Sequence, residues 1–108
     1  TKTKMDKATE KSEKAQKIKE EQEKEYWCKK TIQYKNKIEK IKEEIAEAEK
    51  ELSGENSMYL SYKEKKAIQK KIKSEKKKLK YAENDLAEFE DEAHRKGIPP
   101  GWLRCQFE

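Results

Sequence analysis

Few residues in this chain have side chains that could do chemistry. The sequence contains two cysteines, Cys28 and Cys105, and one histidine, His94. A nucleophile needs a base held beside it, and a metal site needs several ligands at short spacing. There is no Cys-x-x-Cys motif and no glycine-rich phosphate loop. His94 lies near the end of a predicted helix, where a partial positive charge complements the helix dipole. The sequence therefore predicts no enzyme, no metal, no cofactor and no small-molecule substrate.

The composition predicts long helices with charged surfaces. Of the 108 residues, 47% are charged and only 31% are hydrophobic, which leaves room for one small domain. Such values are found both in disordered chains and in long helices, so the periodicity must decide between them. Four of the five Gly and Pro residues lie in the segment 97–101, so the preceding chain has almost no turn signals. No apolar run is long enough to span a membrane.

Two stretches carry the heptad pattern of a coiled-coil seam. The first comprises Trp27, Thr31, Tyr34, Ile38, Ile41, Ile45, Ala48 and Leu52. The second comprises Met58, Ile68, Ile72, Leu79, Ala82, Leu86, Phe89 and Ala93, interrupted by the polar residues Ser61, Lys65 and Glu75. The pattern predicts an all-α fold, an antiparallel two-helix coiled-coil hairpin over residues 18–96. Residues 1–17 are predicted to be a polar helical extension or a frayed segment.

The turn of the hairpin is predicted near residues 53–57, where the sequence reads Ser-Gly-Glu-Asn-Ser. Gly54 suits the position just after a helix, and Ser57 or Ser61 suits the N-cap of the next. Folding at this turn places Ile38 opposite Ile72 or Glu75, and Trp27 opposite Ala82 or Leu86.

The last twelve residues, 97–108, form a predicted docking tail. Gly97 ends the second helix, and the two prolines that follow prevent its continuation. We expect a folded-back, non-helical tail whose burial orders it, since one buried apolar side chain contributes about 1.5–3 kcal/mol. The predicted docking residues are Ile98, Trp102, Leu103 and Phe107 on the tail, and Leu86, Phe89 and Trp27 on the helices. A disordered tail, or a tail that docks on another protein, is the alternative.

The predicted fold brings the two cysteines within reach of each other. Cys28 lies roughly 15–21 Å along the helix from the end of the second helix. Nine extended residues from there to Cys105 reach at most about 30 Å. We therefore predict a disulfide between Cys28 and Cys105, which would hold the tail and indicate an oxidising compartment. Two free thiols in a cytosolic protein are the alternative.

Lysine is concentrated in two segments. The first basic segment, residues 29–42, has six Lys and one Glu, and the second basic segment, residues 63–80, has ten Lys and two Glu. In the predicted hairpin these segments lie side by side as a basic belt. It is flanked by a first acidic segment, residues 43–51, and a second acidic segment, residues 83–92. Such a belt suits nucleic-acid phosphate, an acidic protein surface or anionic lipid. Lysine stems that cover a narrow seam while their charges stay solvated are the simpler interpretation. The candidates for polyanion contact are Lys70, Lys73, Lys77, Lys78 and Lys80.

A two-helix hairpin is marginal in water by itself, so we expect another protein or a second copy of the chain to cover part of it. The candidate interface lies off the seam and comprises Tyr59, Leu60, Tyr62 and Tyr81. The predicted function is a non-catalytic structural rod, an accessory or assembly subunit that binds another protein or itself. The alternative is a nucleic-acid or other polyanion binder that uses the lysine belt.

The tail Gly-Ile-Pro-Pro-Gly-Trp-Leu-Arg follows a Glu-rich helix that ends Asp-Glu-Ala-His-Arg-Lys. Over residues 86–104 the chain thereby resembles the ends of some uncharacterised exported bacterial coiled-coil proteins. The resemblance implies export and a helical hairpin, and it implies no activity. We therefore expect a periplasmic or extracellular location, with the cytoplasm as the alternative.

Overall fold

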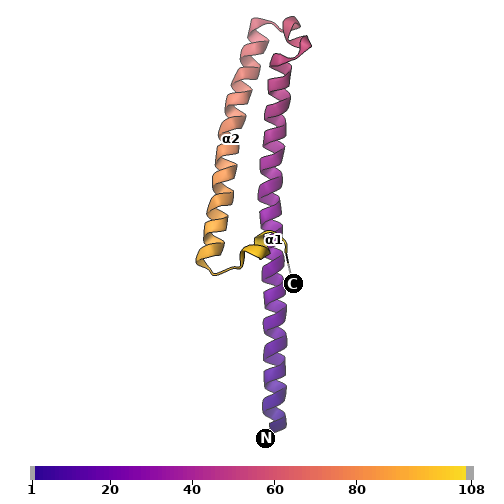
Figure 1. Ribbon diagram of the computed structural model, residues 1–108, viewed down its shortest axis with the longest axis vertical. Helices are drawn as coiled ribbons and strands as arrows, with labels where there is room; N and C mark the ends of the chain where they lie inside the picture. The colour runs from indigo at the N-terminus through magenta and orange to yellow at the C-terminus, as the bar shows by residue number, and fades with distance from the viewer. Residues whose placement is uncertain (1, 107–108) are drawn as a thin grey trace.

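The computed structural model describes the backbone of residues 2–106 and the side chains of residues 15–106. Its elements in chain order are α1 (Lys2–Ser53), the 3-10 helix η1 (Glu55–Tyr59), α2 (Tyr62–Arg95) and the short helix α3 (Pro100–Leu103). Figure 1 shows α1 and α2 packed side by side in opposite directions, with η1 at the closed end and the tail folded back against α1. The predicted all-α antiparallel hairpin is confirmed. Residues 2–17 continue α1 past the tail as a single helix.

The seam between α1 and α2 follows the phase of the heptads rather than residue type. All eight positions of the first stretch are buried or half-buried, including the polar Thr31. In the second stretch Glu75 is buried and Lys65 half-buried, so these polar residues occupy seam positions instead of interrupting it. Met58 does not belong to the seam, and its assignment there was wrong: its side chain is 76% exposed.

The closed end of the hairpin is larger than the predicted turn. Residues 55–59 form η1, and α2 begins only at Tyr62, with Ser61 as its N-cap accepting a hydrogen bond from the Glu64 backbone N–H at 3.1 Å. Gly54 follows α1 as predicted, but its backbone is extended, with φ −76° and ψ 171°. Glycine is favoured there because the backbone of residue 54 lies close to that of Lys50: a Cβ would be 2.8 Å from the Lys50 carbonyl oxygen.

The larger turn shifts the register, and the predicted pairing of the helices is wrong. Ile38 lies in one cluster with Ala82, against which Leu79 and Leu86 also pack, so its partners begin about two turns further along α2 than predicted. Trp27 packs on Phe89, with the ring centroids 4.8 Å apart. The physical reason is that η1 carries the chain beyond the end of α1 before α2 starts (Figure 1).

The far end of α2 terminates in a Schellman motif. Gly97 adopts φ +73°, its N–H donates to the His94 carbonyl at 3.1 Å, and the Ile98 N–H donates to the Ala93 carbonyl at 2.9 Å. The tail was predicted to be non-helical, but Pro100–Leu103 form one turn of helix. Proline at the start of a helix loses no hydrogen bond and has a suitable φ, which explains why the turn can form here.

Candidate functional site

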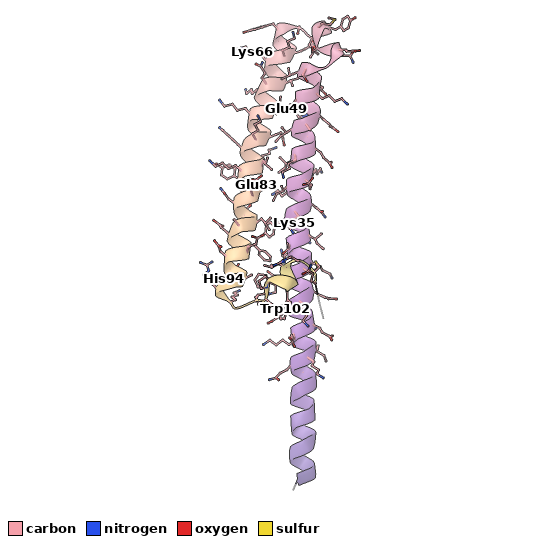
Figure 2. The ribbon with its side chains drawn as sticks, in the orientation of Figure 1. Lys35, Glu49, Lys66, Glu83, His94 and Trp102 are labelled. Carbon is pink, nitrogen blue, oxygen red and sulfur yellow. A yellow bond between two sulfur atoms is a disulfide. The ribbon has the colours of Figure 1, made fainter. Side chains whose placement is uncertain are left out.

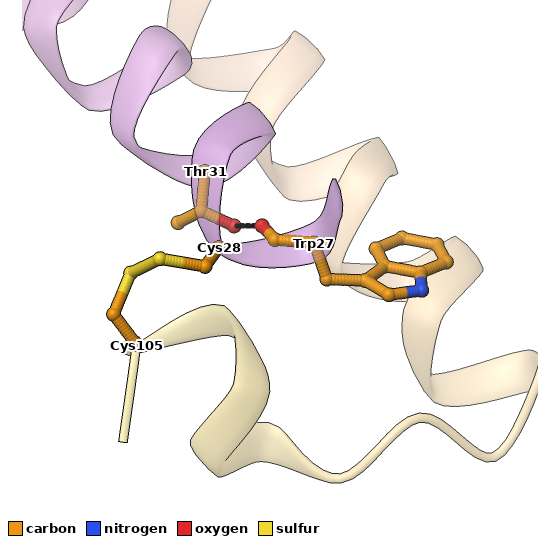
Figure 3. The surroundings of a disulfide bond; sticks show 4 residues. All are labelled: Trp27, Cys28, Thr31 and Cys105. Atoms are coloured by element: carbon orange, nitrogen blue, oxygen red, sulfur yellow. Dashed lines mark hydrogen bonds between the residues drawn. A yellow bond between two sulfur atoms is a disulfide. The ribbon is translucent and has the colours of Figure 1, made fainter. Parts of the chain in front are cut away.

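The folded-back tail is held covalently. Cys28 on α1 and Cys105 after α3 form the predicted disulfide, with an S–S distance of 1.97 Å and Cα atoms 4.9 Å apart (Figure 3). Cys105 has φ +59°, a left-handed conformation that is uncommon for a residue with a side chain. Beside the disulfide, the fully buried Thr31 donates a hydrogen bond from Oγ1 to the Trp27 carbonyl at 2.7 Å. The hydroxyl of this seam residue is thereby satisfied within its own helix.

An aromatic cluster lies under the tail. Trp27, Phe89 and Ala93 are buried together, and the partly buried Tyr34 packs against them. The Trp27 and Phe89 rings are tilted by 37°, and Tyr34 lies 5.1 Å from Phe89 between centroids. Rings at these separations attract one another beyond the simple burial of area. The cluster is the docking surface for the tail.

Three of the residues predicted to dock from the tail pack against this cluster. Ile98, Trp102 and Leu103 pack against it, and Trp102 lies beside α1 in Figure 2. The ammonium of Lys24 lies 5.5 Å from the centre of the Trp102 ring. Leu86, predicted to receive the tail, instead packs with the isoleucines of the seam, because the register differs. Phe107 lies outside the described residues.

Three of the four residues of the predicted interface lie at the closed end of the hairpin, and the fourth, Tyr81, does not. Tyr59 and Tyr62 are 82% and 76% exposed and lie at the closed end of the hairpin, with Leu60 half-buried between them. Tyr81 is 69% exposed, but it lies roughly 28 Å further along α2 than Tyr62. The signal that sequence reasoning missed is Met58, which is exposed beside Tyr59. We call Met58, Tyr59, Leu60 and Tyr62 the tip patch.

A buried carboxylate lies in the seam at the middle of the hairpin. Glu75 is only 7% exposed, and its Oε1 accepts a hydrogen bond from Lys78 Nζ at 3.2 Å. This hydrogen bond lowers the pKa of Glu75 below its usual range, although desolvation acts to raise it. Glu75 Oε2 has no hydrogen-bond partner among the described residues. The residue is therefore held charged in an incompletely satisfied site.

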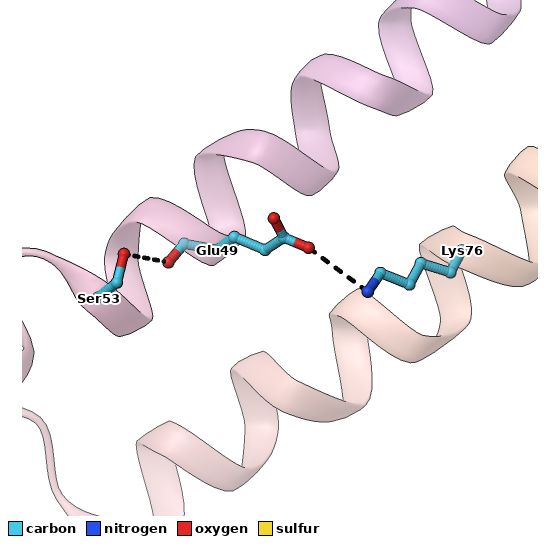
Figure 4. Close-up of polar contacts among 3 residues, drawn as sticks. All are labelled: Glu49, Ser53 and Lys76. Carbon is cyan, nitrogen blue, oxygen red and sulfur yellow. Dashed lines mark hydrogen bonds and ion pairs between the residues drawn. The ribbon is translucent and has the colours of Figure 1, made fainter.

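The corrected register separates the two basic segments. Glu49 of the first acidic segment pairs with Lys76 of the second basic segment at 3.5 Å (Figure 4). Lys40 of the first basic segment lines the same groove as Asp85 of the second acidic segment. Each basic segment thus largely faces an acidic segment of the other helix, and the predicted belt of two adjacent basic segments is not formed.

The five lysines predicted to contact a polyanion do not all lie on the same face of α2. Lys70, Lys73, Lys77 and Lys80 are exposed, and their spacing of three and four residues places them on one face of α2. Lys78 lies off that face and donates to Glu75 in the seam.

His94 is exposed in the last turn of α2, near the end of the hairpin where the tail begins (Figure 2), and it lines a groove together with Thr31 of α1 and Leu103 of the tail. Within residues 15–106, whose side chains are described, no group of three or more His, Cys, Asp or Glu side chains could hold a metal ion. In the same part of the chain, no helix is long and apolar enough to cross a membrane.

The fold and the site define a helical hairpin closed by a disulfide between its first helix and its folded-back tail. Comparison with known protein families, with curated proteins and with solved structures found no match to this chain.

Proposed function

We propose that this protein is a non-catalytic rod, an accessory or assembly subunit that binds another protein or a second copy of itself through the tip patch. The observation that carries the proposal is the exposure of Met58, Tyr59 and Tyr62 at the closed end of a molecule whose surface is otherwise dominated by charged side chains. Tyrosine and methionine are enriched in protein interfaces, where they supply large contact area.

Nothing in the packing of the hairpin requires these three side chains. They lie on η1, which has no buried residue, and on the first turn of α2, away from the seam. A shorter polar turn would connect two helices equally well. A rigid rod that presents an apolar patch at one end is suited to reaching a partner at a fixed distance from the stapled tail.

The disulfide supports an oxidising compartment for this rod. We propose the periplasm or the exterior of the cell, in line with the resemblance of the tail to exported coiled-coil proteins.

Site-specific photo-crosslinking in cells that produce the protein tests the proposed function. A photoreactive phenylalanine replaces Tyr59, and in a matched control it replaces the exposed Asn84 of α2. We expect a discrete adduct from position 59 and none from position 84. The same reaction with purified protein shows whether the adduct has the mass of two copies.

The adduct from position 59 should disappear when Met58→Ser and Tyr62→Ser are combined, because both residues are exposed and their loss leaves the seam intact. Absence of any adduct at position 59, or identical adducts at positions 59 and 84, would overturn the proposal.

A further inference from the structure

Six lysines form one row on α2. Within the second basic segment, steps of three and four residues place these six on a single face of the helix, and all six are exposed. The members of this lysine row are Lys63, Lys66, Lys70, Lys73, Lys77 and Lys80. The row extends over about 25 Å at 1.5 Å per residue. It lies opposite the seam residues Ile72 and Leu79, so it faces away from α1.

The charges of the lysine row are not needed to hold the hairpin together. The ion pairs formed by the second basic segment employ Lys76, which reaches Glu49 on α1, and Lys78, which reaches Glu75. Both lysines lie beside the seam rather than in the row. Among the described residues, no member of the lysine row makes an ion pair. Like charges three or four residues apart repel one another, so the row destabilises the helix that carries it.

Exposed tyrosines lie at the two ends of the row. Tyr62 precedes it, and the ammonium of Lys66 lies 5.3 Å from the centre of the Tyr62 ring. Tyr81 follows directly after Lys80 and is 69% exposed. Aromatic rings beside a basic track are the usual elements of surfaces that bind single-stranded nucleic acid, where the charges follow the phosphates and the rings stack on bases.

We propose that the lysine row and its two tyrosines bind an extended phosphodiester strand along the outer face of α2. A straight row on one rigid helix matches a flexible strand that can lie along it. Insertion into a membrane is not favoured, because an interfacial helix needs a broad apolar face directed at the lipid, and the apolar face of α2 is occupied by α1. This site differs from the predicted belt, since it lies on one helix and includes no residue of the first basic segment.

Binding of a short oligodeoxythymidine to the full chain, followed by fluorescence anisotropy between about 50 and 200 mM salt, tests the proposal. Six phosphate contacts to a single strand predict a slope of about −4 for log K against log salt. Replacing Lys66, Lys70, Lys73 and Lys77 by Gln should flatten the slope by about 3 units and weaken binding at low salt at least about tenfold. Glutamine is a good helix former, and circular dichroism checks that the fold is retained.

The matched control replaces four exposed lysines of α1 by Gln, which alters the net charge equally. These are Lys29, Lys37, Lys40 and Lys42. The proposal predicts nearly unchanged binding in this control, whereas equal losses in the two variants would mean that only net charge matters and would overturn it. Replacing Tyr62 and Tyr81 by Ser should weaken binding of the oligonucleotide but not of inorganic polyphosphate, which has no bases.

Two further outcomes are decisive. Binding of both oligonucleotide and polyphosphate, with neither weakened when Tyr62 and Tyr81 are replaced, would assign recognition to phosphate and exclude stacking by the tyrosines. Absence of oligonucleotide binding at low salt would overturn the proposal, as would binding only to vesicles of anionic lipid. The row variant replaces no residue of the tip patch, so its result is independent of the crosslinking at position 59, whereas the tyrosine variant shares Tyr62 with the tip patch.

Discussion

Removing the disulfide should be the most destabilising single change in this protein. Cys28 and Cys105 are separated by 77 positions, so the bond closes a loop that contains most of the hairpin. The chain-entropy relation gives about 4.5 kcal/mol for a loop of this length at 25 °C. The left-handed backbone of Cys105 offsets about 1 kcal/mol of this. We therefore expect the Cys28→Ser/Cys105→Ser variant to lose about 3–4 kcal/mol in the free energy of unfolding.

Urea unfolding followed by far-ultraviolet circular dichroism measures this loss, with oxidised wild type and the double variant compared at equal concentration. A loss of this size corresponds to a fall in Tm of more than about 12 °C for a chain of this length. Wild type treated with reductant serves as a second sample and should match the double variant. If the double variant is already unfolded at 25 °C, the disulfide contributes at least as much as the whole unfolding free energy of the oxidised protein.

The reasoning fails if the double variant and oxidised wild type differ by less than about 1 kcal/mol. Such a result would mean that the packing of Ile98, Trp102 and Leu103 holds the tail without the bond. A complementary measurement is Trp102→Ala in the oxidised protein. Because the tail stays attached there, this change should cost less than loss of the disulfide.

Substitutions at four further positions test the seam, the turn and the two ends of α2. Glu75→Leu should raise the urea midpoint at pH 7, because it removes a buried carboxylate with an unpartnered oxygen. The folded-state pKa of Glu75 is lowered, so its ionisation contributes stability above the unfolded pKa, and this contribution is lost as the pH falls through the folded value. Between pH 7 and pH 3, the unfolding free energy of the Glu75→Leu variant should therefore fall less steeply than that of the wild type. An unchanged profile would contradict this. Gly54→Ala should lower the free energy of unfolding, measured with urea, by about 2 kcal/mol, because the new Cβ would collide with the backbone carbonyl of Lys50. Gly54→Asn should lower it by at least as much, because asparagine has the same Cβ. At Gly97 a Cβ would have space, and only the positive φ disfavours other residues. Gly97→Ala should therefore lower the free energy of unfolding by about 1 kcal/mol, and Gly97→Asn by less, because asparagine tolerates a left-handed backbone. If alanine and asparagine had the same effect at both glycines, steric contact at Gly54 and backbone conformation at Gly97 would not be the separate causes. Ser61→Ala should cost about 1 kcal/mol, measured in the same way, through loss of the N-cap to Glu64.

The hairpin could be predicted from the sequence because its main determinant is local phase. The heptad steps identify eight positions of α1 that are all buried or half-buried, including Thr31, and they place Glu75 in the second frame although its type argues against burial. The C-terminal end of α2 could also be predicted, since glycine in a left-handed conformation followed by proline is a strong stop signal. The helical turn at Pro100 was missed, although proline at the first position of a helix is a recognised signal for one.

The register and the surfaces could not be predicted in the same way. Register depends on the length of the connection, and η1 has no periodic pattern that separates it from an irregular turn. An error of about two turns at Ile38 placed the two basic segments side by side, although the structure sets each largely against acidic residues. The lysine row itself was visible as steps of three and four residues. Four of its six members, Lys70, Lys73, Lys77 and Lys80, were among the predicted polyanion contacts, but the prediction grouped them with Lys78 and did not recognise a single face of the helix.

The disulfide also determines how the molecule responds to pulling. Tension applied between the projecting part of α1 and the chain after Cys105 passes directly from Cys28 to Cys105 through the covalent bond. The hairpin lies in the closed loop outside this load path, so it is not unzipped when the two ends are drawn apart. Reduction would transfer the same load to the tail and then to the seam between α1 and α2. The oxidised rod is therefore mechanically protected, with a strength that its small apolar core could not provide.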